Sequence, residues 1–97
     1  MAKRSTDRCP THPGAFLREV VIPDLGMPKV QIAEAIGISR QTLFDLTSER
    51  QAVTPQMAVR LGIVFRNSPE SWLNMQVAYD LWLARRQVDV SRIRVLS

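Results

Sequence analysis

Arg40 and Gln41 begin a short predicted helix, and their side chains are of the types that read bases in DNA. An arginine can donate two hydrogen bonds to guanine, and a glutamine can form a similar pair of bonds with adenine. Phe44, one turn after Arg40, can contact the methyl group of thymine. Asp45 is repelled by DNA unless it accepts a hydrogen bond from the amino group of cytosine or orients a neighbouring side chain. We therefore predict that these four side chains read bases. A solvated face, or packing of Phe44 against a dimer mate or partner protein, is the alternative.

Two short helices joined by a tight turn must position these side chains. Apolar residues recur on one face of each helix between residues 29 and 46: Ile32, Ala33, Ile36, Leu43 and Leu46. Ala33 permits a close helix crossing, Gly37 supplies a left-handed turn residue, and Ser39 stands in the N-cap position of the second helix. This pattern predicts a helix-turn-helix, a motif whose second helix enters the DNA major groove.

Contacts with the phosphate backbone are expected at both ends of the same motif. Ser39 and the first-turn amides suit phosphate, because the N-terminus of a helix attracts anions. Lys29 starts the first helix, whereas Ser48 and Arg50 follow the second. We predict that Lys29, Ser48 and Arg50 contact the DNA backbone.

The net charge of +4 suggests an anionic partner, but the charge is unevenly placed. Residues 1–8 carry +2 and residues 85–97 carry +3, while residues 9–84 carry −1. Attraction to phosphate must therefore come from local placement, from the two ends of the chain, or from the pairing of two copies. The arginines of the C-terminal end are either phosphate ligands or solvated side chains.

Length and composition indicate one ordinary globular domain. The chain has 97 residues, of which 45% are hydrophobic and 23% are charged. No apolar run approaches the roughly 20 residues of a membrane span, and no signal-peptide core follows the N-terminus. A single cysteine, Cys9, cannot form an internal disulfide, so we expect a cytoplasmic protein with no membrane association.

Helix signals divide the chain into an all-α domain of five helices. The helices are expected from Pro13 to about Ile22, where Pro23 should stop the first, and then over residues 28–37, 40–48, 55–66 and 69–86. Residues 1–11 are expected to form a flexible arm, residues 12–86 the DNA-binding domain, and residues 87–97 a short tail. The tail fits either a strand or a helical turn, and it should dock on its own domain or on a partner.

The last helix carries two apolar stripes. The first stripe contains Trp72, Met75, Tyr79, Trp82 and Leu83. Leu73, Val77 and Leu81 form a second stripe, offset from the first around the helix. A helix that is apolar over most of its circumference is buried on more than one side. The second stripe is therefore a predicted homodimer interface, and packing of both stripes in one core is the alternative.

Catalysis finds little support in the sequence. His12, the only histidine, precedes a proline at a helix entrance and is expected to act as a local cap. Neither a metal cluster nor a cysteine–histidine pair can be assembled from one histidine and one cysteine. We expect no metal, no cofactor and no enzymatic activity.

Four segments give the chain a resemblance to HigA-type antitoxins, the Xre-like helix-turn-helix proteins of the VapI/HigA group. The segments cover residues 12–27, 32–46, 53–65 and 68–85, and the last of them, with SPESWLNMQVAYDLW, is the most specific. The resemblance implies a lambda-repressor-like fold and a dimeric antitoxin. Such a protein would bind a small HigB-like toxin, similar to the RelE ribonucleases, and would bind the operator DNA of its own operon as a repressor.

The resemblance also assigns site residues. It places base reading on Ser39, Arg40, Gln41 and Asp45, and backbone contacts on Lys29, Thr42, Ser48 and Arg50. The chain departs from the family pattern at two places. Ser48 and Glu49 replace a frequent Asn-Gly turn, so the reading helix is expected to end differently. Asp45 stands where a basic or neutral residue is usual, which affects operator sequence and affinity.

Two other functions fit the same sequence. One is a free-standing repressor without a toxin. The other is a protein-interaction module that has lost DNA binding, which the acidic balance of residues 9–84 and Asp45 favour.

Overall fold

The structure, a computed structural model, describes residues 8–96 and contains five helical segments there, with no strand. The first segment joins α1 (Pro13–Phe16), the π-helical η1 (Leu17–Val21) and α2 (Ile22–Leu25) without a break. The others are α3 (Lys29–Ile36), α4 (Arg40–Thr47), α5 (Pro55–Phe65) and α6 (Pro69–Gln87), followed by a 3₁₀ turn, η2 (Val90–Arg92). The prediction of an all-α fold of five helices is confirmed.

The prediction that Pro23 ends the first helix is wrong. The helix widens into a π-type turn, in which the Ile22 N–H donates to the Leu17 carbonyl five residues earlier. Pro23 then falls in the first turn of α2, where a residue without an N–H is tolerated. The helix continues to Leu25 and ends at Gly26, which is left-handed at φ 63°.

Serine and threonine side chains cap the starts of α4, α5 and α6. Ser39, Thr54 and Ser68 each accept a hydrogen bond from the backbone N–H three residues later, at 3.0–3.2 Å. Each cap satisfies one of the N–H groups that a helix start leaves without a partner. The helix starts are therefore encoded locally.

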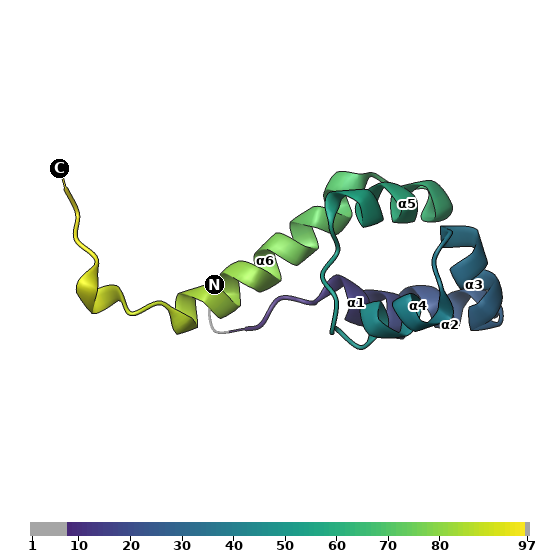
Figure 1. Cartoon of the computed structure of the whole chain (residues 1–97), viewed down its shortest axis with the longest axis horizontal. Coiled ribbons are helices and arrows are strands. Elements are labelled where there is room, and N and C mark those ends of the chain that lie inside the picture. Colours follow the sequence, from purple (N-terminus) through teal and green to yellow (C-terminus); the bar gives the residue numbers. More distant parts are fainter. Residues whose placement is uncertain (1–7, 97) are drawn as a thin grey trace, which may run out of the picture.

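The core lies between the first helix, α3, α4 and α5, and Trp72 from the first turns of α6 completes it. Its fully or almost fully buried apolar residues are Leu17, Ile32, Ala33, Ile36, Leu43, Leu46, Val53, Met57, Ala58, Leu61 and Trp72. All five apolar residues predicted to face inward from the helix-turn-helix are in this set. From the core, α6 runs outward toward the C-terminal end (Figure 1).

Only one of the two apolar stripes on α6 is mainly enclosed by the chain itself. In the first stripe, Trp72 is fully buried and Met75 is partly buried against the core; in the second, only Leu73 packs there. Val77 and Leu81, in contrast, are 52% and 46% exposed. Packing of both stripes in one core is thus not what the structure shows.

Gln76, which the sequence analysis did not single out, is a buried polar residue on α6. Its Oε1 accepts from the backbone N–H of Val53 at 2.7 Å, and its Nε2 donates to Asp80 Oδ1 at 3.0 Å. The amide therefore satisfies a backbone group of the loop before α5. No helical periodicity indicates this role, because the partner lies 23 residues away.

The C-terminal tail does not pack on its own domain in residues 88–96, which leaves docking on a partner as the open alternative. Residues 88–96 are exposed and contain a 3₁₀ turn rather than a strand. Two apolar side chains at the end, Val95 and Leu96, are 88% and 98% exposed. The segment after α6 has too few neighbours in one copy to bury them. Most of the predicted flexible arm, residues 1–7, lies outside the described residues, as does Ser97.

His12 caps the first helix, as the sequence predicts. Its Nδ1 accepts from the Gly14 N–H at 2.9 Å, and its ring meets Tyr79 edge to face at 4.8 Å. Burial lowers the pKa of His12 below its ordinary value of 6.5, although Glu49 and Asp80 oppose the shift. Arg18 lowers the pKa further. The neutral ring is therefore the form that the fold favours.

We expect the fold to lose stability in mild acid. Because the folded state holds the proton of His12 less tightly than the unfolded chain, the free energy of unfolding is highest above pH 6.5. It should fall as the pH drops through 6.5 toward the lower folded pKa, by at most about 1.4 kcal/mol per pH unit. Urea unfolding of the wild type and His12→Asn between pH 5 and 8 tests this. Asparagine also caps a helix but does not titrate, so an equally steep loss in the variant would contradict the assignment.

Candidate nucleic-acid interface

The turn between α3 and α4 holds the two helices of the motif in place. Gly37 adopts φ 82°, a left-handed conformation that suits glycine, and ends α3. From α5, the Arg60 guanidinium donates to the carbonyls of Ile36 and Gly37 at 3.1 and 3.3 Å. A cation at a helix C-terminus is electrostatically favourable. Arg60 therefore fixes the turn, a role that the sequence did not reveal.

The other end of α4 is fixed against the first helix. Gly14 packs so closely on the Leu46 carbonyl that any Cβ at this position would collide with it. The Arg18 guanidinium donates to the Thr47 carbonyl at 2.6 Å and to Glu49 at 3.2 Å. These contacts satisfy and stabilise the C-terminal end of α4.

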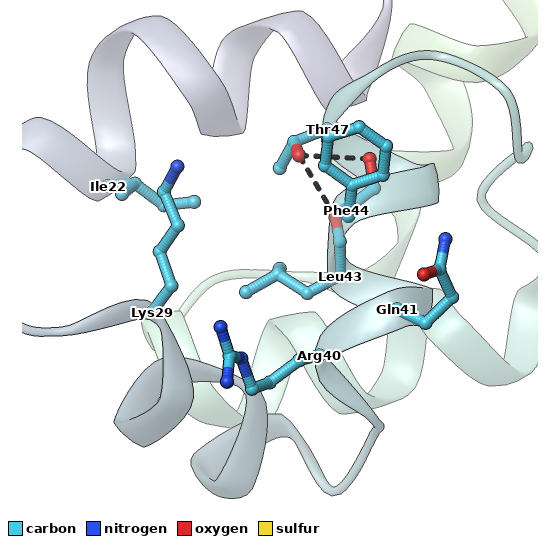
Figure 2. A pocket seen from close by; sticks show the side chains of 7 residues that line it. All are labelled: Ile22, Lys29, Arg40, Gln41, Leu43, Phe44 and Thr47. Atoms are coloured by element: carbon cyan, nitrogen blue, oxygen red, sulfur yellow. Dashed lines mark hydrogen bonds between the residues drawn. The ribbon is translucent and has the colours of Figure 1, made fainter.

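The predicted reading residues Arg40, Gln41 and Phe44 are exposed on α4, and Asp45 is partly exposed. Three of the predicted base-reading residues line one shallow pocket of about 470 Å³ together with Lys29 of α3. The complete lining is Ile22, Lys29, Arg40, Gln41, Leu43, Phe44 and Thr47. Figure 2 shows Ile22 and Lys29 on one side of the pocket, and Phe44 and Thr47 on the opposite side. The face combines two cations with apolar surface.

Ser39 and Thr42 form a hydrogen-bonded pair at the start of α4. The Ser39 hydroxyl accepts from the Thr42 N–H at 3.0 Å and donates to Thr42 Oγ1 at 2.9 Å. The Ser39 side chain is thus occupied by capping. The Thr42 hydroxyl receives this bond and retains its own hydrogen as a donor.

Asp45 interacts with another residue that is predicted to read bases. The Gln41 Nε2 donates to Asp45 Oδ1 at 2.9 Å, across one turn of α4. The Arg50 guanidinium lies 5.7 Å from the centre of the Phe44 ring, within cation–π distance. Gln41 and Asp45 therefore orient one another before any partner binds, and so do Phe44 and Arg50.

The end of α4 is shaped by Ser48 and Glu49. The Ser48 hydroxyl donates to the Phe44 carbonyl at 2.6 Å, so it is directed back onto the helix. Glu49 adopts φ 65°, the left-handed conformation that a glycine would take at lower cost. In this conformation the Glu49 carboxylate forms an ion pair with the Arg18 guanidinium. The helix thus ends at Thr47, with a non-glycine residue in the turn.

No group of three or more histidine, cysteine, aspartate or glutamate residues within residues 8–96 is arranged to hold a metal ion. Among the helices of that same part of the chain, none combines the length and apolarity that a membrane crossing requires.

A helix-turn-helix family model matches residues 17–73, more than half of the chain. The chain belongs to the helix-turn-helix family. The matched region runs from η1 to the first turns of α6 and contains every predicted DNA-contacting residue. The family consists of DNA-binding regulators and antitoxins rather than enzymes, which confirms that part of the sequence analysis.

Curated relatives refine the family assignment. The chain is 38% identical to the uncharacterized HTH-type transcriptional regulator YddM of Escherichia coli K12, over 87% of this chain and 88% of YddM. It is 34% identical to antitoxin HigA-1 of Vibrio cholerae, over 87% of this chain and 79% of that protein. The predicted resemblance to Xre-like HigA antitoxins is confirmed.

Solved structures agree with this assignment. Antitoxin GraA superposes with a TM-score of 0.84 at 35% identity, covering 92% of this chain and 99% of GraA. Antitoxin HigA of Pseudomonas aeruginosa with the higBA promoter superposes with a TM-score of 0.81 at 30% identity, covering 91% of this chain and 99% of that one. The five-helix fold is therefore the fold of known antitoxins.

Proposed function

We propose that this protein is a dimeric antitoxin that binds the operator of its own operon and represses it. The observation that carries the proposal is the exposed face of α4, where Arg40, Gln41 and Phe44 lie beside a cationic pocket. Neighbouring structures of the same fold include a HigA antitoxin with promoter DNA. The proposed toxin partner is a small HigB-like protein similar to the RelE ribonucleases, which the HigA relationship supports.

In the proposed complex, the N-terminal half of α4 enters the major groove. Arg40 suits guanine, Gln41 suits adenine and the Phe44 ring suits a thymine methyl group. Asp45 lies at the same face through its bond to Gln41. Ser39 would approach the bases chiefly through its backbone, because its hydroxyl is occupied by the cap.

Phosphate contacts are assigned to residues around α4. Lys29 lies across the pocket from α4, and Arg50 lies beside Phe44 at the opposite end of the reading face. The Thr42 hydroxyl has a hydrogen to donate. Ser48 is the weakest candidate among the four proposed phosphate contacts, because its hydroxyl is directed to the Phe44 carbonyl. We therefore assign most of the phosphate attraction to Lys29 and Arg50.

Dimerisation through α6 would complete the DNA-binding unit. Leu73, Val77 and Leu81 recur every four residues on one side of α6, and the last two remain about half exposed. Two helix-turn-helix units related by a two-fold axis read two half-sites about one DNA turn apart. Pairing of two copies also doubles the positive charge, which offsets the slightly acidic balance of residues 9–84.

The substitution Arg40→Ala tests the placement of α4. Removing the guanidinium should cost about 1–3 kcal/mol of operator binding and relax the preference at one base position of each half-site. The measurement is a mobility-shift titration against the promoter DNA of the protein's own operon, repeated with single base-pair changes. Arg66→Ala, an arginine at the end of α5 on no proposed contact surface, is the matched control for loss of one charge.

Other outcomes of this titration identify other functions. No shift of the wild type at low salt contradicts a repressor and favours a protein-interaction module. Specific binding that weakens steeply with salt supports DNA recognition. Antitoxin and free-standing repressor are then separated by the neighbouring gene: a short reading frame that is toxic alone and harmless together with this protein identifies the toxin.

A further inference from the structure

Asp45 is the one acidic residue of α4, and it lies on the face that the proposed function turns toward DNA. A carboxylate in this position is repelled by the phosphates. It can only accept hydrogen bonds, so it cannot pair with the acceptor atoms of guanine, adenine or thymine. This cost for DNA binding is offset if Asp45 accepts from the amino group of cytosine or orients a neighbouring side chain.

The hydrogen bond from Gln41 to Asp45 supplies such a role. A glutamine amide has two broad orientations that exchange its oxygen and nitrogen, and little else on an exposed helix distinguishes them. At 2.9 Å from Asp45 Oδ1, only the NH₂ group is compatible with the carboxylate. The reversed amide would place two acceptors against each other. Asp45 therefore selects one orientation of the Gln41 amide.

The selected orientation matches one base. One N–H of Gln41 is used by Asp45, which leaves the second N–H and Oε1 for a partner. Adenine presents an acceptor, N7, beside a donor, the N6 amino group, in the major groove. An amide whose donor and acceptor are already oriented pairs with these two atoms without a further loss of side-chain freedom.

We propose that Asp45 is a positioning residue that sets the specificity of Gln41 for adenine in the operator. The inference rests on the proposed function, because it requires α4 in the major groove. Asp45 lowers the non-specific affinity for DNA, because it is repelled by phosphate, and it raises the discrimination between bases. A carboxylate that merely stabilised α4 would have no effect on base preference.

The proposal predicts opposite effects of one substitution on two affinities. In Asp45→Ala, binding to a duplex without an operator should become roughly 1.5- to 5-fold tighter, because a repulsive charge is removed. The preference for adenine at the Gln41 position should fall by roughly 2- to 12-fold, because the amide is no longer held. Asp45→Asn removes the charge but retains an acceptor. It should gain the same non-specific affinity and lose less of the preference.

The experiment titrates duplexes from the protein's own promoter region, each with one base pair replaced. The proteins are the wild type, Asp45→Ala, Asp45→Asn, Gln41→Ala and the double variant Gln41→Ala with Asp45→Ala. Gln41→Ala should abolish the adenine preference, and the double variant should lose no more of it than Gln41→Ala alone. Far-ultraviolet circular dichroism confirms that each variant remains helical.

The outcomes separate the inference from the proposed function. A wild type without any preferred sequence overturns DNA reading by α4 and the inference with it. A wild type with a clear preference that Asp45→Ala retains in full overturns the inference alone. So does a preference for cytosine that persists in Gln41→Ala and disappears in Asp45→Ala, because Asp45 would then read a base directly.

Discussion

Replacing Trp72 with alanine is expected to lower the free energy of unfolding by about 3–5 kcal/mol. The side chain is fully buried, and its ring lies 5.9 Å from that of Phe16 and 6.0 Å from that of Phe65. Its Nε1 donates to Asn67 Oδ1 at 2.6 Å. Trp72 thus joins the first helix, α5 and α6, and its removal leaves a cavity between all three. Total stabilities of small domains are about 5–15 kcal/mol, so the loss is a large part of the whole.

Urea unfolding followed by circular dichroism measures this effect. Trp72→Phe keeps most of the packing but loses the bond to Asn67, and it should fall between the wild type and the alanine variant. Ile63→Ala, at a side chain that is 74% exposed, is the control for removal of an apolar group and should change stability by less than about 0.5 kcal/mol. An alanine variant as stable as this control would show that Trp72 does not hold the helices together.

The helix starts and the exposed face of α4 were predictable because their signals are local. Ser39, Thr54 and Ser68 precede their helices by the spacing that a side-chain cap requires, and each makes its bond. Gly37 carries the positive φ that a steep helix crossing needs. The exposure of Arg40 and Gln41 followed from the positions of the buried leucines, since a helix separates its faces by a fixed angle.

The effect of Pro23 was not predictable, because the rule that applies to a proline depends on the hydrogen-bond pattern of the residues before it. A proline inside an α-helix clashes with the carbonyl four residues earlier. A π-type turn removes this conflict, and nothing in the sequence LREVV distinguishes such a turn from an α-helix. The end of the first helix was therefore placed too early.

Long-range contacts were not predictable from one sequence. Arg60 bonds the end of α3 across 24 residues, Gln76 bonds Val53 across 23, and Arg18 bonds Thr47 across 29. Each partner is a backbone group, which carries no side-chain identity to search for. The Gln41–Asp45 bond is different, because a spacing of four residues on one helix permits it. The sequence thus allowed Asp45 to orient a neighbour, and the structure names the neighbour as Gln41.

The double substitution Val77→Glu with Leu81→Glu is expected to convert the proposed dimer to a monomer and to weaken operator binding by about 10²- to 10⁴-fold. The two side chains are 52% and 46% exposed on one side of α6, so in one copy the glutamates remain solvated and the fold persists. A two-fold interface brings the same surface of both copies together, so four glutamates would gather there and like charges would be buried together. A copy bound at one half-site would then no longer raise the effective concentration of a second copy at the other half-site.

Light scattering after size exclusion measures the mass, and titration of an operator with both half-sites measures the affinity. The matched control is Val59→Glu with Ile63→Glu on α5, which has the same spacing, comparable exposure and the same added charge. The control should remain dimeric and lose only the affinity that two negative charges remove. On a duplex with a single half-site the two variants should bind alike. A dimeric α6 variant, or equal losses on the full operator, would show that Val77 and Leu81 are not at the interface and would leave the exposed tail as the next surface to change.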